Sequence, residues 1–330
     1  MKAASFPTLL ERFFLERLMR QRQASPHTIS SYRDTFRLLL QFAKRRLHKP
    51  PSGLSLADVD APLITAFLDD LEATRKISVR SRNLRLTAIR SFFHYAAYEE
   101  PAHAAQIQRI LAIPGKRCVK PLVGFLDRPE IDALLAAPDQ RSWYGRRDHL
   151  LLLLAVQTGL RLSELTGLRP QDLHLGSGAH VRCVGKGRRE RCTPLTQPVV
   201  VALKSWLKEP AQSEGWLFSN ARGGRLSADA VQRLLTKYRQ VAARVCPSLT
   251  KKRVTPHVLR HTLAMQLLQA GIDRSVIALW LGHESVETTQ IYLDADLALK
   301  EKALAKTAQH RSGCRLFKAE DRLLAFLDSL

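Results

Sequence analysis

Residues 255–261 read Thr-Pro-His-Val-Leu-Arg-His, and this short stretch says more about the fold than any other part of the chain. His257 and Arg260 are three residues apart, so a helix would place both side chains on one face. A histidine and an arginine on a shared helix face can serve acid–base and anion-binding chemistry together. Most pairs of this kind are structural, however, so the stretch has to be considered with its surroundings.

Three further segments accompany it along the sequence. They are Thr158-Gly-Leu-Arg-Leu-Ser-Glu-Leu165, Gly185-Lys186-Gly187, and Leu281-Gly282-His283, the last followed by Tyr292. Each has an ordinary explanation by itself. An arginine after a glycine is usually a surface residue, a lysine at a hairpin tip is usually solvated, and a lone tyrosine usually packs in a core. The information therefore lies in their combination and order.

Together, the four segments closely resemble the tyrosine recombinase (phage integrase) family, especially its Xer-like bacterial members. The resemblance covers nearly the whole chain and implies a mainly α fold. A SAM-like helical core-binding domain would precede an α-rich catalytic domain with a small β-sheet or hairpin, the two forming a C-shaped clamp on duplex DNA. The six active-site positions of the family are all occupied, by Arg161, Lys186, His257, Arg260, His283 and Tyr292.

The resemblance also implies a role for each residue. Arg161 and Arg260 would hold the non-bridging oxygens of the phosphate and stabilise the transition state without a metal ion. Tyr292 would be the nucleophile, and His257 the base that activates it, because the pKa of a free tyrosine is about 10. Lys186 would protonate the leaving 5′ oxygen.

The remaining residues of the motifs have supporting roles. His283 would hydrogen-bond the phosphate and orient the tyrosine, Glu164 would be a buried partner of an arginine, and His261 would be structural or supporting. The 3′-phosphotyrosine intermediate would store the bond energy, so we expect no cofactor, no ATP and no metal. The sequence has neither a G-x-x-x-x-G-K-[ST] loop nor an acidic cluster for Mg²⁺.

The implied function is site-specific DNA recombination, by sequential strand exchange through a four-way junction. The expected partners are double-stranded DNA and further protomers, which form a tetramer on it with or without a second recombinase. One alternative is a type IB topoisomerase-like nicking enzyme, and another is a DNA-binding protein with a decayed catalytic set. Dimer resolution, integration or transposition of a mobile element, excision and inversion stay open, as does the target site.

Composition independently favours a nucleic-acid partner. The chain has 330 residues, 45% of them hydrophobic, and a net charge of +22. Half of this excess lies in residues 1–120, so both halves are expected to contact a polyanion. General solubility or an anionic membrane surface is the alternative. The longest apolar run, Leu150–Val156, is too short to cross a bilayer, no signal peptide is recognisable, and five cysteines without a CxxC pair suit a reduced cytoplasm.

The N-terminal part shows a helical pattern, which predicts a domain over residues 1–100. Leu9, Phe13 and Leu18 mark one apolar stripe, and Ser25-Pro26 signals the start of a second helix. Asp60 and Ser78 signal two more, through Leu71 and Tyr98. The predicted buried stripe of the fourth helix comprises Leu84, Ala88, Phe92 and Tyr95.

Basic residues cluster around this fourth helix and after it. No acid interrupts the run from Arg75 to Arg90, so we predict phosphate contacts rather than a merely solvated face. Residues 101–123 are predicted to be a basic linker containing one short helix, Ala104 to Leu111. The predicted DNA-binding residues are Arg75, Lys76, Arg80, Arg82, Arg85, Arg90, Lys116, Arg117 and Lys120.

The catalytic domain is predicted to span residues 124–310, with a helix that begins by capping at Asp127. Short β-prone runs around the glycine-flanked Lys186 predict a hairpin between His180 and Leu195. Residues 311–330 form a predicted tail helix with leucines at helical spacing. Such a helix could dock on a neighbouring subunit or fold back on its own domain, and the pattern does not decide between them.

Overall fold

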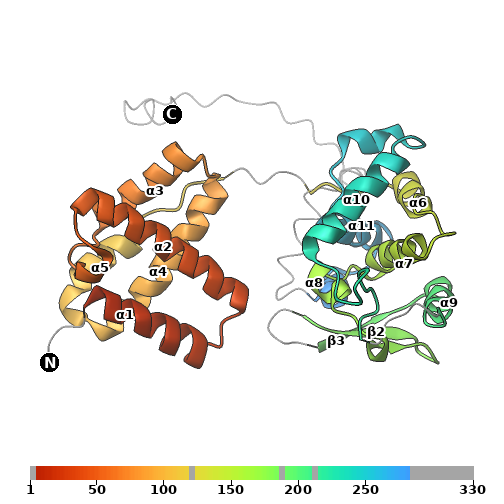
Figure 1. Cartoon of the computed structure of the whole chain (residues 1–330), viewed down its shortest axis with the longest axis horizontal. Coiled ribbons are helices and arrows are strands. Elements are labelled where there is room, and N and C mark those ends of the chain that lie inside the picture. Colours follow the sequence, from red (N-terminus) through yellow and green to blue (C-terminus); the bar gives the residue numbers. More distant parts are fainter. Residues whose placement is uncertain (1–4, 119–122, 186–189, 210–214, 283–330) are drawn as a thin grey trace, which may run out of the picture. The chain divides into compact units, whose positions relative to one another are not determined.

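The chain divides into two compact units, Met1–Lys120 and Pro121–Leu330 (Figure 1). The computed structural model describes residues 5–118, 123–185, 190–209 and 215–282. Within these ranges the structure is mainly helical, with one small antiparallel sheet in the second unit, which confirms the predicted fold class. No described helix combines the length and the apolar character needed to span a membrane.

The N-terminal unit is a helical bundle whose starts are fixed by local side-chain caps. Ser25, Asp60 and Ser78 each accept a hydrogen bond from the backbone N–H three residues ahead, at 3.2, 2.8 and 3.2 Å, as predicted. The bundle contains α1 (Phe6–Arg12), the π-helical continuation η1 (Phe13–Gln21), α2 (Pro26–Leu47), α3 (Ala61–Arg75), α4 (Val79–Glu99) and α5 (Ala104–Leu111).

Aromatic packing around α4 forms the core of this unit. The ring of Phe92 lies 5.0–5.5 Å from four other buried rings, those of Phe6, Phe13, Phe36 and Phe93. The predicted stripe was right for Ala88, Phe92 and Tyr95, but wrong for Leu84, which is 59% exposed. Leu86 and Ile89, which lie outside the predicted stripe, are buried instead of Leu84, because neighbouring helices cover α4 on more than one side.

Residues 101–118 are packed onto this bundle. Helix α5 coincides with the predicted helix, and its Ile107 and Ile110 are fully buried in the same core. Farther on, the Asn83 side chain bonds both the backbone N–H and the backbone carbonyl of Lys116, at 3.0 and 2.8 Å. The segment predicted as a linker is therefore part of the N-terminal unit as far as Lys116.

The second unit places a small sheet beside a helical core (Figure 1). Asp127 and Glu130 form a reciprocal capping box at the start of the first helix, so the predicted start is confirmed. Helix α7 carries a run of buried leucines, and α11 packs along it. The helices are α6 (Arg128–Ala136), α7 (Trp143–Thr158), α8 (Leu162–Thr166), α9 (Gln197–Trp206), α10 (Ala228–Ala242), α11 (Pro256–Gln269) and α12 (Arg274–Leu281).

The sheet confirms the predicted hairpin and adds a strand to it. β2 (His180–Val184) pairs with β3 (Glu190–Pro194), and Cys183 lies opposite Arg191 in the register. β1 (Leu173–His174) pairs with the other edge of β2, giving the order β1-β2-β3. Two residues are too few for a periodic pattern, so β1 could not be predicted from the sequence.

Candidate active site

The geometry of the candidate site begins with Gly159, which ends α7. Its φ of +61° is a left-handed conformation that glycine adopts at little cost. A Cβ at this position would lie 2.7 Å from the Leu281 Cδ2 atom and 2.9 Å from the Leu263 Cδ2 atom. Gly159 therefore lets the end of α7 approach α11 and α12 closely, and Arg161 follows two residues later.

Arg260 and Arg161 are anchored to one short stretch of backbone. The buried Arg260 guanidinium donates from Nη1 to the Gly159 carbonyl at 2.6 Å and from Nη2 to the Leu281 carbonyl at 2.5 Å. Arg161 donates from Nη2 to the next carbonyl, that of Gly282, at 2.7 Å. The last carbonyls of a helix carry partial negative charge, which stabilises both cations at the end of α12. The structure thus brings the two sequence-predicted arginines together.

Glu164 holds Arg161 from the other side. Its carboxylate, only 3% exposed, accepts from the Arg161 backbone N–H at 2.7 Å and from Arg161 Nη1 at 3.0 Å. This confirms the expectation that Glu164 is a buried partner of an arginine. Burial alone would raise the pKa of Glu164, but hydrogen bonds from Arg191 and from Arg161 outweigh it and lower that pKa below its ordinary value. The carboxylate is therefore ionised at neutral pH.

Arg191 was not predicted from the sequence, yet it is the second cation on Glu164. Its Nη1 and Nη2 donate to the two carboxylate oxygens at 2.9 and 2.6 Å, in the paired geometry that a guanidinium fork favours. The sequence signal that could have found it is its position in the strand after Gly185-Lys186-Gly187, opposite the buried Cys183.

His257 and His261 lie on α11 with Arg260. His257 is exposed in the first turn of the helix, and its ring stacks on that of His261 with centroids 6.2 Å apart. Burial, together with the smaller effects of the neighbouring His257 and Arg260, lowers the pKa of His261 to about 4. His261 is therefore neutral at neutral pH, which fits a supporting role.

The lowered pKa of His261 gives a testable pH dependence of stability. Between about pH 6.5 and pH 4 the unfolded chain binds a proton that folded His261 does not, so its stabilising effect is complete above that window and lost as the pH falls. We expect roughly 1 kcal/mol less stability at pH 5 than at pH 7 from this group, allowing for partial solvent screening. Calorimetric unfolding should show a flatter pH profile for His261→Gln, whereas His27→Gln, at an exposed position, should follow the wild-type curve.

Three of the six predicted catalytic residues, Lys186, His283 and Tyr292, lie outside the described residues. The same holds for Lys120 and the predicted tail helix, residues 311–330. Gly185, which directly precedes Lys186, and Gly282, which directly precedes His283, are described. Both lie against the cluster formed by Arg161, Arg191 and Glu164. A Cβ at Gly185 would be 3.2 Å from the Glu164 Oε1 atom, and one at Gly282 would be 2.9 Å from the Arg191 Nη1 atom.

The predicted DNA-binding residues of the N-terminal unit have different environments. Arg75, Lys76, Arg80 and Arg117 are exposed. Arg85 donates to the Ser31 carbonyl and the Thr35 hydroxyl, Arg90 donates to the Ile113 carbonyl, and Lys116 pairs with Glu72.

Arg82 does not fit its predicted role. Its side chain is 5% exposed, and its Nε atom lies 3.4 Å from a carboxylate oxygen of Glu72 on α3. The run from Arg75 to Arg90 contains no acid, but Glu72 reaches Arg82 from the preceding helix. In this conformation Arg82 is a buried ion-pair partner rather than a surface cation.

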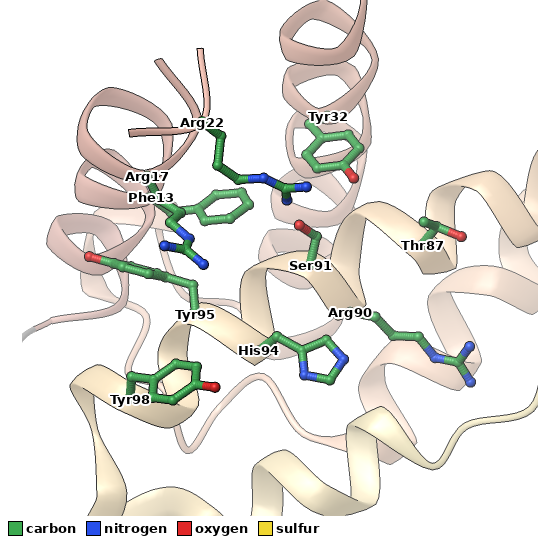
Figure 2. A pocket seen from close by; sticks show the side chains of 10 residues that line it. All are labelled: Phe13, Arg17, Arg22, Tyr32, Thr87, Arg90, Ser91, His94, Tyr95 and Tyr98. Atoms are coloured by element: carbon green, nitrogen blue, oxygen red, sulfur yellow. The ribbon is translucent and has the colours of Figure 1, made fainter. Parts of the chain in front are cut away.

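A cationic cavity of about 620 Å³ lies on the same unit. Its walls combine the basic side chains of Arg17, Arg22, Arg90 and His94 with aromatic rings, and none of its described lining residues is acidic. Figure 2 shows Arg17 and Arg22 reaching from η1 and its end toward α4, whereas Arg90 points away from both. Sequence reasoning missed Arg17, Arg22 and His94, because only the packing of η1 against α4 brings them together.

Comparison with known proteins assigns both units. Residues 124–298 match the phage integrase family, and residues 11–100 match the phage integrase N-terminal SAM-like domain. The y4rC protein of Sinorhizobium fredii (strain NBRC 101917 / NGR234), named as an integrase/recombinase, is 66% identical over 330 residues, covering 100% of this chain and 99% of its own length.

More distant relatives have the same fold and family. Tyrosine recombinase XerC of Syntrophus aciditrophicus (strain SB) is 32% identical over 287 residues, which cover 82% of this chain and 88% of the relative. The crystal structure of the XerH site-specific recombinase in a post-cleavage complex with its palindromic difH substrate aligns with a TM-score of 0.67 at 23% identity, covering 87% of this chain and 82% of that one. The chain therefore belongs to the phage integrase family of tyrosine recombinases, which cleave and rejoin DNA in site-specific recombination.

Proposed function

We propose that this recombinase joins two DNA duplexes through a 3′-phosphotyrosine on Tyr292, by sequential strand exchange through a four-way junction in a tetramer. The observation that carries the proposal is the joint anchoring of Arg161 and Arg260 at the end of α12. Double-stranded DNA as the ligand is supported by the net charge of +22 and by the substrate-bound XerH complex.

The two arginines are suited to hold a phosphate during attack. Arg161 uses two of the five N–H groups of its guanidinium on Glu164 and Gly282, and its side chain is 25% exposed. Arg260 is fixed by two backbone carbonyls, so its charge needs no reorganisation when the phosphate becomes more negative. The cluster is preorganised for a pentacoordinate phosphate, whose added charge falls on the non-bridging oxygens.

Tyr292, His257 and Lys186 each have one proposed part in cleavage and rejoining. The Tyr292 oxygen attacks phosphorus and its proton passes to His257, which is exposed at the start of α11. The bond from phosphorus to the 5′ oxygen breaks, and Lys186 supplies the proton to that oxygen. In the rejoining step a 5′ hydroxyl attacks the phosphotyrosine, and the two protons return. Each step exchanges one phosphoester bond for another, so the proposed reaction needs no ATP, and the two arginines take the place of a metal ion.

To test the proposal, cells that contain the full-length protein are lysed under denaturing conditions. The DNA that remains covalently bound to the protein is then recovered and sequenced. We expect the recovered fragments to share one short sequence, which would be the target site. A Tyr292→Phe strain processed in parallel should give no recovered DNA above background. Fragments without any shared sequence, or equal recovery from both strains, would contradict the proposal.

We propose that the exposed cations of the N-terminal unit contact DNA phosphates. Each phosphate contact contributes about 0.9 to the slope of log affinity against log salt concentration. Arg80→Ala should therefore lower affinity for the recovered site and reduce that slope by about one. Arg82→Met is the matched comparison, because it removes a buried cation. Loss of the ion pair with Glu72 should lower the melting temperature but leave the slope of the salt dependence unchanged. Fluorescence anisotropy across a salt series measures both, and equal slopes for Arg80→Ala and wild type would refute the contact.

The role of Lys186 as general acid has its own test. A substrate with sulfur in place of the bridging 5′ oxygen has a leaving group that needs little protonation. Lys186→Ala should therefore cleave this substrate at close to the wild-type rate, although it cleaves the oxygen substrate slowly. Arg260→Ala should remain slow on both, because its loss removes charge stabilisation rather than a proton. Absence of rescue would leave Lys186 as a positioning residue.

Tetramer formation rests on the family resemblance. Size-exclusion chromatography with light scattering, run with duplexes carrying the recovered site, should show four protomers with two duplexes. Deletion of residues 314–330 should abolish that complex if the tail docks on a neighbour. If the tail instead packs on its own domain, the deletion should lower the melting temperature of the free protein.

A further inference from the structure

We propose that Arg191 is a positioning residue for the cleavage reaction, because it neutralises Glu164 and so leaves the charge of Arg161 to the phosphate. The proposal rests on the proposed role of Arg161 in holding the phosphate. It assigns to β3 a function beyond carrying one side of the hairpin.

Arg191 sets the net charge of the cluster around Glu164. Glu164 is 3% exposed, and its carboxylate accepts from both Arg161 and Arg191, so two positive charges surround one buried negative charge. The cluster as a whole is therefore cationic. Without Arg191, Arg161 and Glu164 would form a neutral pair, and the phosphate would meet a much weaker field from this side.

Arg191 also protects the hydrogen bonds of Arg161. Without Arg191, each oxygen of the buried Glu164 carboxylate would keep one bond, from the Arg161 backbone N–H and from Arg161 Nη1, and a buried charge with so few donors is costly. The Arg161 guanidinium, which already bonds Glu164 Oε1 at 3.0 Å, has further N–H groups that could supply the missing bonds. A second bond from Arg161 to Glu164 would turn the guanidinium away from the Gly282 carbonyl and from the position proposed for the phosphate.

Arg191 also lies close to the chain on both sides of the site. The Arg191 guanidinium lies between two glycines: its Nη1 atom is 3.0 Å from where a Cβ of Gly185 would be and 2.9 Å from where one of Gly282 would be. These glycines directly precede Lys186 and His283 in the sequence. Arg191 thus packs against the backbone at the points where two predicted catalytic segments begin.

Packing alone is a poor explanation for an arginine at this position. Its side chain is 11% exposed, and its Nε atom is buried without a hydrogen-bond partner among the described residues. An unpaired buried N–H is destabilising, and a methionine of similar length would avoid that cost. The features that only arginine supplies are its charge and its fork toward Glu164.

The test compares single-turnover cleavage with DNA affinity, using full-length protein and a nicked duplex that carries the recovered target site. Arg191→Met should slow cleavage roughly tenfold to 100-fold at saturating protein, the range found when a hydrogen-bond partner of a metal ligand is lost, and should change affinity less than about threefold. Arg191→Lys keeps the charge without the fork and should lie between Arg191→Met and wild type. Arg128→Met, which removes an equally charged but exposed side chain, should match wild type.

A double variant separates positioning from stability. Glu164→Gln combined with Arg191→Met removes both buried charges, so it should fold even if Arg191→Met does not. It should cleave faster than Arg191→Met where that variant folds, because no carboxylate then competes for Arg161, but slower than wild type. The proposal is overturned if folded Arg191→Met or Arg191→Lys cleaves at the wild-type rate, if the double variant cleaves no faster than folded Arg191→Met, or if affinity falls as much as the cleavage rate. Arg161→Ala is measured in parallel: if it cleaves normally, the proposed function itself has failed, whereas a slow Arg161→Ala with a normal Arg191→Met refutes the role of Arg191 alone.

Discussion

Replacing Arg161 or Arg260 with alanine is expected to slow DNA cleavage by a factor of roughly 10²–10³. Affinity for the target DNA should change only a few-fold, because many other phosphate contacts support binding while these two groups stabilise charge that develops in the transition state. Single-turnover cleavage of a nicked substrate gives the rate, and fluorescence anisotropy gives the affinity. A parallel loss of both quantities would mean that the two arginines are ordinary binding contacts.

The two variants should differ in stability. Arg260 is buried and satisfies the carbonyls of Gly159 and Leu281, so its removal leaves buried acceptors unpaired at about 1–3 kcal/mol each. Arg161 is partly exposed, so Arg161→Ala should unfold closer to the wild-type temperature. Arg260→Lys provides the control for folding, since it retains a positive charge but cannot bond both carbonyls in the same geometry. A lysine variant that folds but cleaves slowly would attribute the effect to geometry rather than to instability.

The features that could be predicted from the sequence are those encoded over a few residues. Ser25, Asp60 and Ser78 cap helices because each side chain bonds an N–H only three residues away, and the pairing of β2 with β3 follows from short β-prone runs on either side of glycines. The separate motifs that contain Arg161 and Arg260 are recognisable from their residue types and order, and the structure places these two arginines together.

The features that escaped prediction depend on contacts between distant segments. Arg82 looked like a surface cation because its ion-pair partner, Glu72, lies on the preceding helix. Arg191 follows Gly185-Lys186-Gly187 in the sequence, but that position does not reveal its contacts with Glu164, 27 residues earlier, and with the backbone at Gly282. The grouping of Arg17, Arg22 and His94 around one cavity likewise requires the bundle to be assembled.

Replacing Tyr292 with phenylalanine is expected to abolish the covalent complex completely and to leave DNA affinity unchanged. Phenylalanine retains the ring but lacks the oxygen that forms the bond to phosphorus, so no partial activity is expected from this position. A nicked duplex that loses a short fragment after cleavage should trap the wild-type protein, because the free 5′ end needed for rejoining diffuses away. The Tyr292→Phe variant should bind the same duplex and give no product resistant to denaturation.

The most direct test of the central claim is to identify the bond in the trapped complex. The complex should be digested with protease and nuclease, and the modified peptide sequenced by mass spectrometry, with end-labelled DNA reporting which strand end is attached. We predict that the nucleotide is on the peptide containing Tyr292 and is joined through a 3′ phosphate. Attachment through a 5′ phosphate, or to any residue other than Tyr292, would contradict the account.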